Sequence, residues 1–193
     1  MNDRSSPDRP ANVRFFVALI PPQEIQDYAT TVIQELGDRF QTRTAKAPPH
    51  VTLYPPFEWP RKRSPELEDC LAQFAAHHAG VPVSLSGFGA FSPRVLYINV
   101  LKTPELLHLQ ANLMAHLEAT LGIVDVTAKR RPFAPHLTVA SRNVTRQTFR
   151  EAWALLQDRS VAFEFLGDRL TLLRHDGGCW QIQRNFSLVH YPP

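Results

Sequence analysis

The chain has 193 residues, enough for one domain with a substantial core, and 44% of them are hydrophobic and 20% charged. This composition is typical of a soluble globular protein, and no apolar run is long enough to cross a bilayer, which excludes a transmembrane helix. The net charge of +3 and the pI of about 9.1 favour an anionic partner only mildly.

The N-terminal ten residues are polar and include acidic residues and prolines. We therefore expect no signal peptide and a disordered tail over residues 1–12. The two cysteines, Cys70 and Cys179, have no metal-ligand spacing around them, so we expect free thiols in a cytoplasmic protein.

The first half of the chain alternates strand-like and helical segments. A buried strand is predicted at residues 13–20, where β-branched and aromatic residues dominate. Apolar residues at helical spacing predict a helix that ends at Gly37, and Ser64-Pro65-Glu66 opens another that ends near residue 78. The other strands expected in this half are residues 50–54, 81–88 and 95–101, with a turn or bulge at Gly87 and Gly89.

The second half repeats a similar pattern. Thr103-Pro104-Glu105 opens a leucine-rich helix that ends at Gly122, and a further helix is predicted over residues 145–156. The expected strands are residues 136–140, 161–166, 169–174 and 180–190, the last two joined as a hairpin by Asp176-Gly177-Gly178. We interpret this order as an internal pseudo-repeat with a boundary near residue 101, inside a single domain over residues 13–193.

One five-residue pattern occurs twice, as Pro49-His50-Val51-Thr52-Leu53 and as Pro135-His136-Leu137-Thr138-Val139. Composition alone predicts about 0.01 such patterns per chain, so two are not expected by chance. Because side chains alternate along a strand, each histidine shares one face with its threonine while the aliphatic residues face the core. The two motifs are therefore the strongest functional signal in the sequence.

The pseudo-repeat and the mixture of helices and short strands predict an α+β fold. We expect two pseudo-symmetric lobes, each with helices and an antiparallel-rich sheet, around a central cleft to which each lobe donates one histidine. A basic connector precedes each motif, with Arg43 and Lys46 before the first and Lys129-Arg130-Arg131 before the second. These connectors are candidates for phosphate contacts, although solvated loops are the simpler interpretation.

Strand parity also places Tyr54 and Arg142 on the side of the cleft, where Arg142 is a candidate phosphate partner. Each has an ordinary structural alternative, a cleft wall for Tyr54 and a solvated side chain for Arg142. Phe133 either stacks on a base or belongs to the core. The candidate substrate contacts beside the motifs are Arg142, Tyr54, Phe133, Arg131 and Lys46.

Two histidines suit general acid–base chemistry at phosphorus, since one can be neutral and the other charged near neutral pH. The neutral ring takes a proton from the attacking oxygen, and the charged ring protonates the leaving oxygen. The threonine hydroxyls can donate hydrogen bonds to the non-bridging oxygens. Neither motif contains an acidic residue for a zinc site, and the chain has no nucleophile elbow or Walker motif. We therefore expect neither a metal nor a nucleotide cofactor.

At these residues the sequence resembles the 2H phosphoesterase superfamily, which includes bacterial RNA 2′,3′-cyclic phosphodiesterases, historically called 2′-5′ RNA ligases. The family's two His-x-Thr/Ser-x motifs are matched by residues 50–53 and 136–139, and its first strand by residues 14–19. The resemblance implies a bilobal α+β fold that hydrolyses 2′,3′-cyclic phosphates to 2′-phosphates. It implies that His50 and His136 are the acid and the base, and that Thr52 and Thr138 hold the phosphate.

The sequence departs from the family pattern after each motif. Tyr54-Pro55-Pro56-Phe57 replaces a phenylalanine-leucine-glycine ending, and Ser141 intervenes before Arg142. Both departures fall where we expect the rim of the substrate site, so they leave the identity of the substrate undetermined. The expected partners are RNA ends or small cyclic-phosphate nucleotides and no membrane, bound by a monomer. Two alternatives are a non-catalytic RNA- or nucleotide-binding module and a 2′-5′ RNA ligase that uses the same residues.

Overall fold

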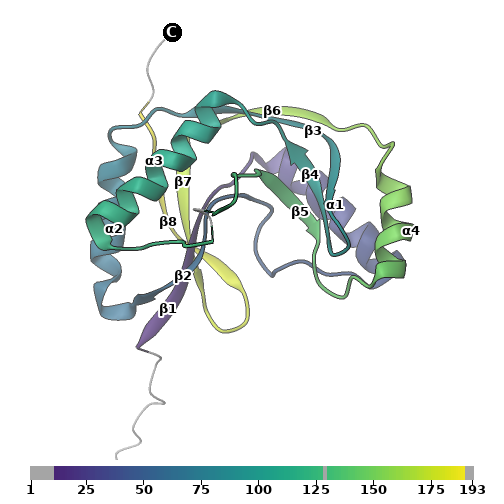
Figure 1. Ribbon diagram of the computed structural model, residues 1–193, viewed down its shortest axis with the longest axis horizontal. Coiled ribbons are helices and arrows are strands. Elements are labelled where there is room, and N and C mark those ends of the chain that lie inside the picture. The colour runs from purple at the N-terminus through teal and green to yellow at the C-terminus, as the bar shows by residue number, and fades with distance from the viewer. Residues whose placement is uncertain (1–10, 128–129, 190–193) are drawn as a thin grey trace, which may run out of the picture.

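The computed structural model describes residues 11–127 and 130–189 (Figure 1). Its strands are β1 (Asn12–Leu19), β2 (Val51–Pro60), β3 (Val81–Phe91), β4 (Val95–Val100), β5 (His136–Ala140), β6 (Ala162–Gly167), β7 (Arg169–His175) and β8 (Trp180–Ser187). Its helices are α1 (Gln23–Phe40), α2 (Ser64–Ala75), α3 (Pro104–Leu121) and α4 (Arg146–Leu156), with a 3-10 turn at Arg61–Arg63. No helix in these two ranges has both the length and the apolar character needed to cross a membrane.

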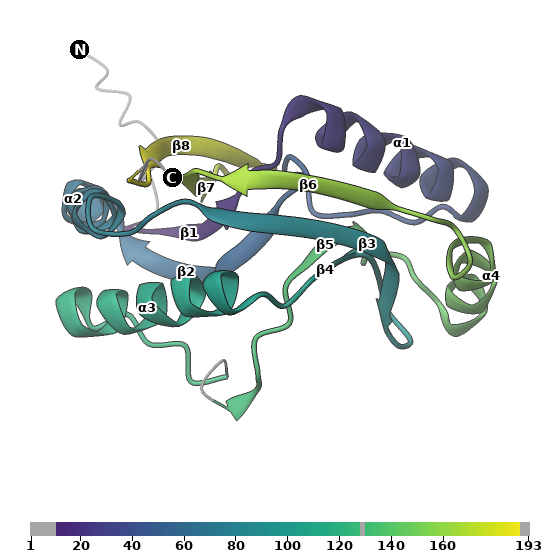
Figure 2. The ribbon, with the colours of Figure 1, turned by 90° about the horizontal axis from the view of Figure 1, so that it is seen from above.

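The described strands form one antiparallel sheet in the order β6-β3-β4-β5-β2-β1-β7-β8. The sheet narrows at its centre, because β2 and β5 share a single register pair, whereas every other neighbouring pair of strands shares four or more. Helices α2 and α3 lie at one end of the molecule and α1 and α4 at the other (Figures 1 and 2). The predicted bilobal α+β fold is confirmed, with the difference that the two lobes share one continuous sheet.

The lobes are not the sequential halves of the chain. Around the β5–β2 junction, β4 mirrors β1 in the sheet order, so the repeated unit is strand, helix, motif strand, helix. The second unit therefore begins with β4 at Val95, before the boundary expected near residue 101. In each unit the first helix crosses to the other lobe, since α1 contacts β5 and α3 contacts β2. These two crossings brace the narrow centre of the sheet.

Helix α3 forms for the reasons that the sequence predicts. The Thr103 hydroxyl accepts the backbone N–H of Leu106 (3.3 Å), and Gly122 ends the helix with a left-handed φ of 69°. Four leucines at helical spacing form its buried stripe: Leu106, Leu109, Leu113 and Leu117. Helix α1 differs from the prediction, because Gln41 takes the left-handed cap and the helix continues past Gly37 to Phe40.

Strand β2 continues to Pro60 instead of ending at Pro55 and Pro56. The register pairs Val17 with Tyr54 and Phe15 with Phe57, so both prolines fall in an irregular stretch of the ladder. Proline has no backbone N–H to donate, and it is tolerated at such an irregularity. The predicted strand over residues 180–190 ends at Ser187 in the structure, and His190 lies outside the described residues.

Replacement of Leu113 by alanine should lower the free energy of unfolding by about 2–5 kcal/mol, because this fully buried side chain anchors α3 and its loss leaves a cavity. Urea denaturation of both proteins measures the difference. Leu101→Ala is the control, since Leu101 is 44% exposed and its loss should change stability by about 0.5 kcal/mol or less. Equal losses in the two variants would contradict this account of the core.

Candidate active site

The two motif strands lie side by side at the narrow centre of the sheet. Val51 of β2 pairs with Leu137 of β5 in an antiparallel register, and both side chains are fully buried. The motif histidines and threonines on either side of this pair are partly exposed. The alternation predicted from the sequence is therefore confirmed, and the single pair that joins the lobes is also the pair that joins the motifs.

The same register brings the four polar motif residues together. Because this single pair is antiparallel, His50 lies on the Thr138 side of it and Thr52 on the His136 side. Each histidine is therefore closer to the threonine of the other motif than the linear sequence suggests, and the four side chains form one group.

Both histidine rings are held by backbone carbonyls two residues earlier in the chain. His50 Nδ1 lies 2.7 Å from the Pro48 carbonyl oxygen, and His136 Nδ1 lies 2.8 Å from that of Ala134. A carbonyl oxygen can only accept, so each Nδ1 carries its proton and donates it. Each Nε2 is then left to take up or release a proton at the site.

The motif proline explains why this arrangement occurs twice. The accepting carbonyls belong to Pro48 and Ala134, the residues directly before Pro49 and Pro135. A residue that precedes proline is restricted to extended conformations, which limits where its carbonyl can point. The proline thus contributes to the orientation of the histidine that follows it.

Burial lowers the pKa of both histidines. For His50, burial is the largest effect; the bond to the Pro48 carbonyl opposes it, and the positive charge on His136 lowers the pKa further. For His136, burial again lowers the pKa and the Ala134 carbonyl opposes it. Because the two rings repel each other when both are charged, one of them takes up its proton before the other.

Aromatic rings pack against both histidines. Phe16 of β1 packs on His50 with ring centroids 4.8 Å apart. His136 packs against both Phe91 and Tyr97, with ring centroids 5.0 and 5.2 Å away, and these two rings also contact each other (4.6 Å). Tyr97 stands opposite Thr138 in the β4–β5 ladder. These apolar neighbours explain why burial dominates both pKa shifts. The sequence analysis did not identify any of the three aromatic residues.

Gly89 makes room for the tyrosine beside His136. It pairs directly with Tyr97 across the β3–β4 hairpin, and a β-carbon added to it would lie 2.3 Å from the Tyr97 Cε2 atom. The ring therefore lies over the backbone of β3, where any larger residue would displace it. The expected bulge at Gly87 is confirmed by its φ of 66° and the register shift beside it, whereas Gly89 belongs to the regular ladder. A glycine opposite an aromatic residue in a hairpin is the signal that could have revealed this contact.

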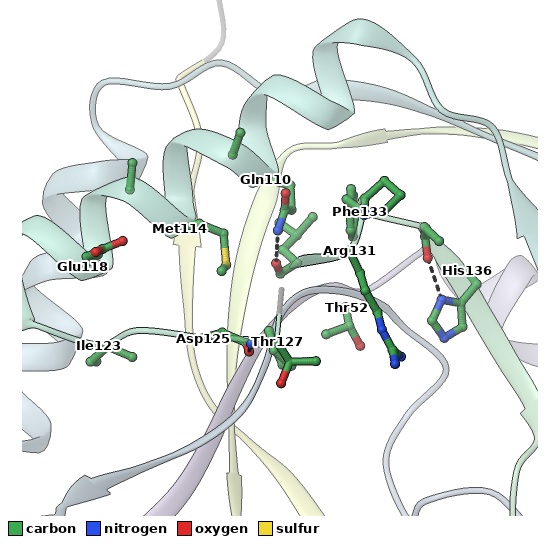
Figure 3. A pocket seen from close by; sticks show the side chains of 16 residues that line it. Thr52, Gln110, Met114, Glu118, Ile123, Asp125, Thr127, Arg131, Phe133 and His136 are labelled. Atoms are coloured by element: carbon green, nitrogen blue, oxygen red, sulfur yellow. Dashed lines mark hydrogen bonds between the residues drawn. The ribbon is translucent and has the colours of Figure 1, made fainter. Parts of the chain in front are cut away.

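A cavity of about 660 Å³ opens beside the motifs and follows α3 (Figure 3). Thr52 and His136 line it, together with one face of α3 and residues from the ranges 123–127 and 131–134, which precede β5. The predicted candidates Arg131 and Phe133 also line it, and Arg131 points into it from that segment, toward the end that holds the motif residues. Lys129 of the same basic connector lies outside the described residues.

Tyr54 does not line the cleft, and this prediction is wrong. The register pairs Ala18 with Thr52 but Val17 with Tyr54, so Leu53 is an extra residue in β2. Such a bulge reverses the alternation of side chains beyond it. The Tyr54 side chain is consequently buried, and its hydroxyl donates to the Ile123 carbonyl oxygen (3.2 Å). Tyr54 supports the segment that forms the cavity wall.

Arg142 and Lys46 lie outside the cavity lining. Arg142 and Arg43 form an isolated backbone bridge, with N–H to oxygen distances of 2.8 and 3.0 Å, and the Arg142 side chain is exposed. The Lys46 carbonyl accepts the backbone N–H of Trp180 (2.7 Å), which places Lys46 beside the β7–β8 hairpin. A substrate contact by either residue stays a prediction. Among the described residues, no group of three histidine, cysteine or acidic side chains is placed to hold a metal ion.

A sequence model of the 2′-5′ RNA ligase superfamily matches residues 21–178. The chain belongs to this superfamily. The resemblance to the 2H phosphoesterases that the two motifs indicate is thereby confirmed. Its sequence relatives include two proteins named "Putative phosphoesterase". The one from Geobacillus sp. (strain WCH70) is 27% identical over 177 residues, which cover 90% of this chain and 95% of the relative. The one from Bacillus pumilus is 27% identical over 180 residues, which cover 91% of this chain and 98% of the relative.

Solved structures show the same superfamily fold. Escherichia coli LigT, crystallised with NADP+, superposes with a TM-score of 0.69 at 19% identity and covers 94% of this chain and 100% of LigT. A protein from Thermus thermophilus superposes with a TM-score of 0.66 at 23% identity, covering 91% and 97%. At these identities the likeness establishes the fold, while the arrangement of the site rests on this chain's own residues.

Replacement of His136 by glutamine should raise the pKa of His50, because it removes the positive charge that opposes protonation of His50. NMR titration of the histidine Cε1–H signals measures this, and in the wild-type protein both motif histidines should titrate below the ordinary value of about 6.5. His108→Gln, an exposed change on α3, should leave the His50 titration where it was. An unchanged His50 pKa in the His136 variant would contradict the coupling.

The lowered pKa values also make stability depend on pH. Below about pH 6.5 the two histidines are protonated in the unfolded chain but still neutral in the folded protein, because their pKa values are lowered there. The free energy of unfolding therefore falls as the pH drops from this value through the folded pKa values. Chemical denaturation between pH 5 and pH 8 should show this fall in the wild-type protein, and the fall should be smaller in His136→Gln.

Gly89→Ala should displace the Tyr97 ring from its place beside His136. It should lower stability by about 1–3 kcal/mol, because the added methyl group has no room under the ring. Denaturation gives the stability, and the shift of the His136 Cε1–H signal reports the position of the ring. Gly178→Ala is the matched control, since its β-carbon would make only an ordinary contact with Asp176. A variant with wild-type stability and an unshifted signal would overturn the proposed packing.

Proposed function

We propose that this protein is a metal-independent phosphodiesterase that hydrolyses 2′,3′-cyclic phosphates to 2′-phosphates by two-histidine acid–base catalysis. The observation that carries the proposal is the antiparallel junction at Val51 and Leu137, which brings His50 and His136 into one group. Both rings have Nδ1 committed to a backbone carbonyl and Nε2 left for proton transfer. Membership of the superfamily and relatives named as phosphoesterases support the same class of reaction.

The reaction needs one proton removed and one supplied. The neutral histidine takes a proton from water through Nε2 while the water oxygen bonds to phosphorus. The bond from phosphorus to the 3′ oxygen breaks, and the charged histidine gives its proton to that oxygen. The products are a 2′-phosphate and a free 3′ hydroxyl, and the two rings have exchanged protonation states.

The other groups at the site stabilise the charge on the phosphate. Thr52 and Thr138 lie next to the central pair of the two motif strands and have hydroxyls that can donate to the non-bridging oxygens. Arg131 points into the same end of the cavity and adds a positive charge. Partial burial of the two threonines strengthens their hydrogen bonds to the phosphate, because the local dielectric constant is lower than that of water.

Ligation is the same kind of displacement with a different nucleophile: the 5′ hydroxyl of a second RNA end attacks phosphorus instead of water, and the bond from phosphorus to the 3′ oxygen breaks. The name of the superfamily makes 2′-5′ ligation the second candidate for this site, with the base acting on the attacking hydroxyl and the acid on the 3′ leaving oxygen as in hydrolysis. An assay that identifies the products of cyclic-phosphate RNA and of cyclic nucleotides separates the two activities. RNA ends and small nucleotides as substrates, a monomeric state and a cytoplasmic location remain part of the proposal.

Replacement of His50 or His136 by alanine should lower kcat on a 2′,3′-cyclic nucleotide by about 100- to 10,000-fold, the usual contribution of acid–base catalysis. The activity of the wild-type protein should survive EDTA. Its pH–rate profile should be bell-shaped with an optimum on the acid side of pH 7. The rate rises with pH as the base loses its proton and falls as the acid loses its own. Because the pKa values of both histidines are lowered, both changes occur at a lower pH than for exposed histidines.

His108→Ala is the matched control, because His108 is exposed on α3 and lies outside the cavity lining. It should retain wild-type turnover and the wild-type pH profile. Near-normal turnover by either motif variant, or activity that disappears with EDTA and returns with metal, would refute the proposed mechanism.

A further inference from the structure

A row of aromatic rings leads away from His50 toward one edge of the sheet. Phe16 packs on His50 with ring centroids 4.8 Å apart, and Trp180 packs on Phe16 at 4.7 Å with an interplanar angle of 80°. Aromatic pairs favour this edge-to-face arrangement. Trp180 is the first residue of β8, and both β1 and β7 lie between β8 and the motif strand β2. The row therefore links the first motif to a residue that lies well outside it.

The two outer rings belong to a small apolar cluster of their own. Phe16 and Trp180 are buried together with Ala18 and Leu173, in a group that is separate from the main core. Leu173 stands directly opposite Phe16 in the β1–β7 ladder, so it supports the Phe16 ring from the neighbouring strand. Because the cluster is small, loss of the indole would leave the Phe16 ring with little to restrain it.

A second connection between Trp180 and His50 runs through the backbone. The Trp180 N–H donates to the Lys46 carbonyl oxygen (2.7 Å). Lys46 lies two residues before Pro48, whose carbonyl accepts the Nδ1 proton of His50. Trp180 thus holds both the ring that packs on His50 and the connector that fixes the tautomer of His50.

The position of Trp180 is itself well fixed. His175 packs on the indole with ring centroids 4.9 Å apart, and the Arg14 guanidinium lies over it at 5.5 Å. The turn before Trp180 is closed by Asp176, whose Oδ1 accepts two backbone N–H groups at 2.7 and 2.8 Å. A ring that is held in this way can restrain the ring it packs against.

We propose that Trp180 is a positioning residue, which holds His50 in the orientation and the poorly solvated surroundings that proton transfer needs. The inference rests on the proposed function, since it takes His50 as one of the two groups that transfer protons. Trp180 acts through Phe16 and through the connector at Lys46. A reacting group keeps its orientation only when packed neighbours lock its side-chain rotamer, and a displacement of about 1 Å can cost about 100-fold in rate.

The first test follows the motif histidines by NMR titration and needs no turnover. Trp180→Leu and Trp180→Met remove the ring but keep an apolar side chain, and the methionine variant carries the test where the leucine variant does not fold. In both, the pKa of His50 should rise toward its ordinary value of about 6.5, because Phe16 is no longer held against the ring and water reaches it. The pKa of His136 should stay as in the wild-type protein, which makes it an internal reference for damage to the fold.

The second test measures hydrolysis of a 2′,3′-cyclic nucleotide. The same variants should lose about 10- to 100-fold in kcat with KM little changed, because substrate still binds while His50 is displaced. The limb of the pH–rate profile that His50 sets should move to higher pH. Trp180→Phe keeps a ring at this position and should restore most of both properties.

Trp153→Leu is the matched control, because Trp153 is a partly buried tryptophan on α4 in the other lobe. It should leave the His50 pKa and kcat as in the wild-type protein. A His50 pKa that stays at the wild-type value in a folded variant without the ring would overturn the positioning role and leave the proposed function standing. Equal pKa changes in both motif histidines, or the same changes in Trp153→Leu, would also overturn it, since they would show a general loosening of the fold. If the wild-type protein hydrolyses no cyclic phosphate, the proposed function fails, and a selective rise in the His50 pKa still supports the restraint of His50 by Trp180.

Discussion

The site depends on one backbone pairing, Val51 with Leu137, at the centre of the sheet. Strand side chains alternate with a period of two, so a slip of one residue would turn His50 and Thr52 toward the core and bury the site's polar groups. The full burial of the central pair holds the register, because exposing two large aliphatic side chains would be costly. The grouping of the motif histidines and threonines is thus a consequence of hydrophobic packing on the other face of the same two strands.

A junction of one register pair is a weak connection between two lobes, and the crossing helices compensate for it. Helix α1 starts after β1 in one lobe and packs against β5 in the other, and α3 makes the reciprocal crossing from β4 to β2. Any separation of the lobes would therefore expose helix faces as well as break the junction. This arrangement leaves the polar face of the junction open while the two histidines keep a fixed relation.

The environment of the histidines has two layers. In the first layer, the backbone carbonyls of Pro48 and Ala134 fix the tautomer by accepting the Nδ1 proton of each histidine. In the second layer, the rings of Phe16, Phe91 and Tyr97 reduce the solvation of the histidines and lower their pKa values. The first layer repeats in both motifs, whereas the second differs between the lobes, with one ring against His50 and two against His136. The hydrogen bonding of the two histidines is therefore nearly symmetric, while the cavity along α3 lies on one side only.

The sequence by itself determined most of the helices and strands and the repeated motif of this protein, because both follow from local signals. The repeated motif, the alternation that sets His50 beside Thr52, and the Thr103 cap of α3 all depend on residues a few positions apart. The tertiary structure alone decided which distant residues meet. A bulge at Leu53 turned Tyr54 into the core, and the approach of α3 to the residues before β5 created the cavity. Such outcomes depend on register and packing between segments far apart in the chain, which no local pattern encodes.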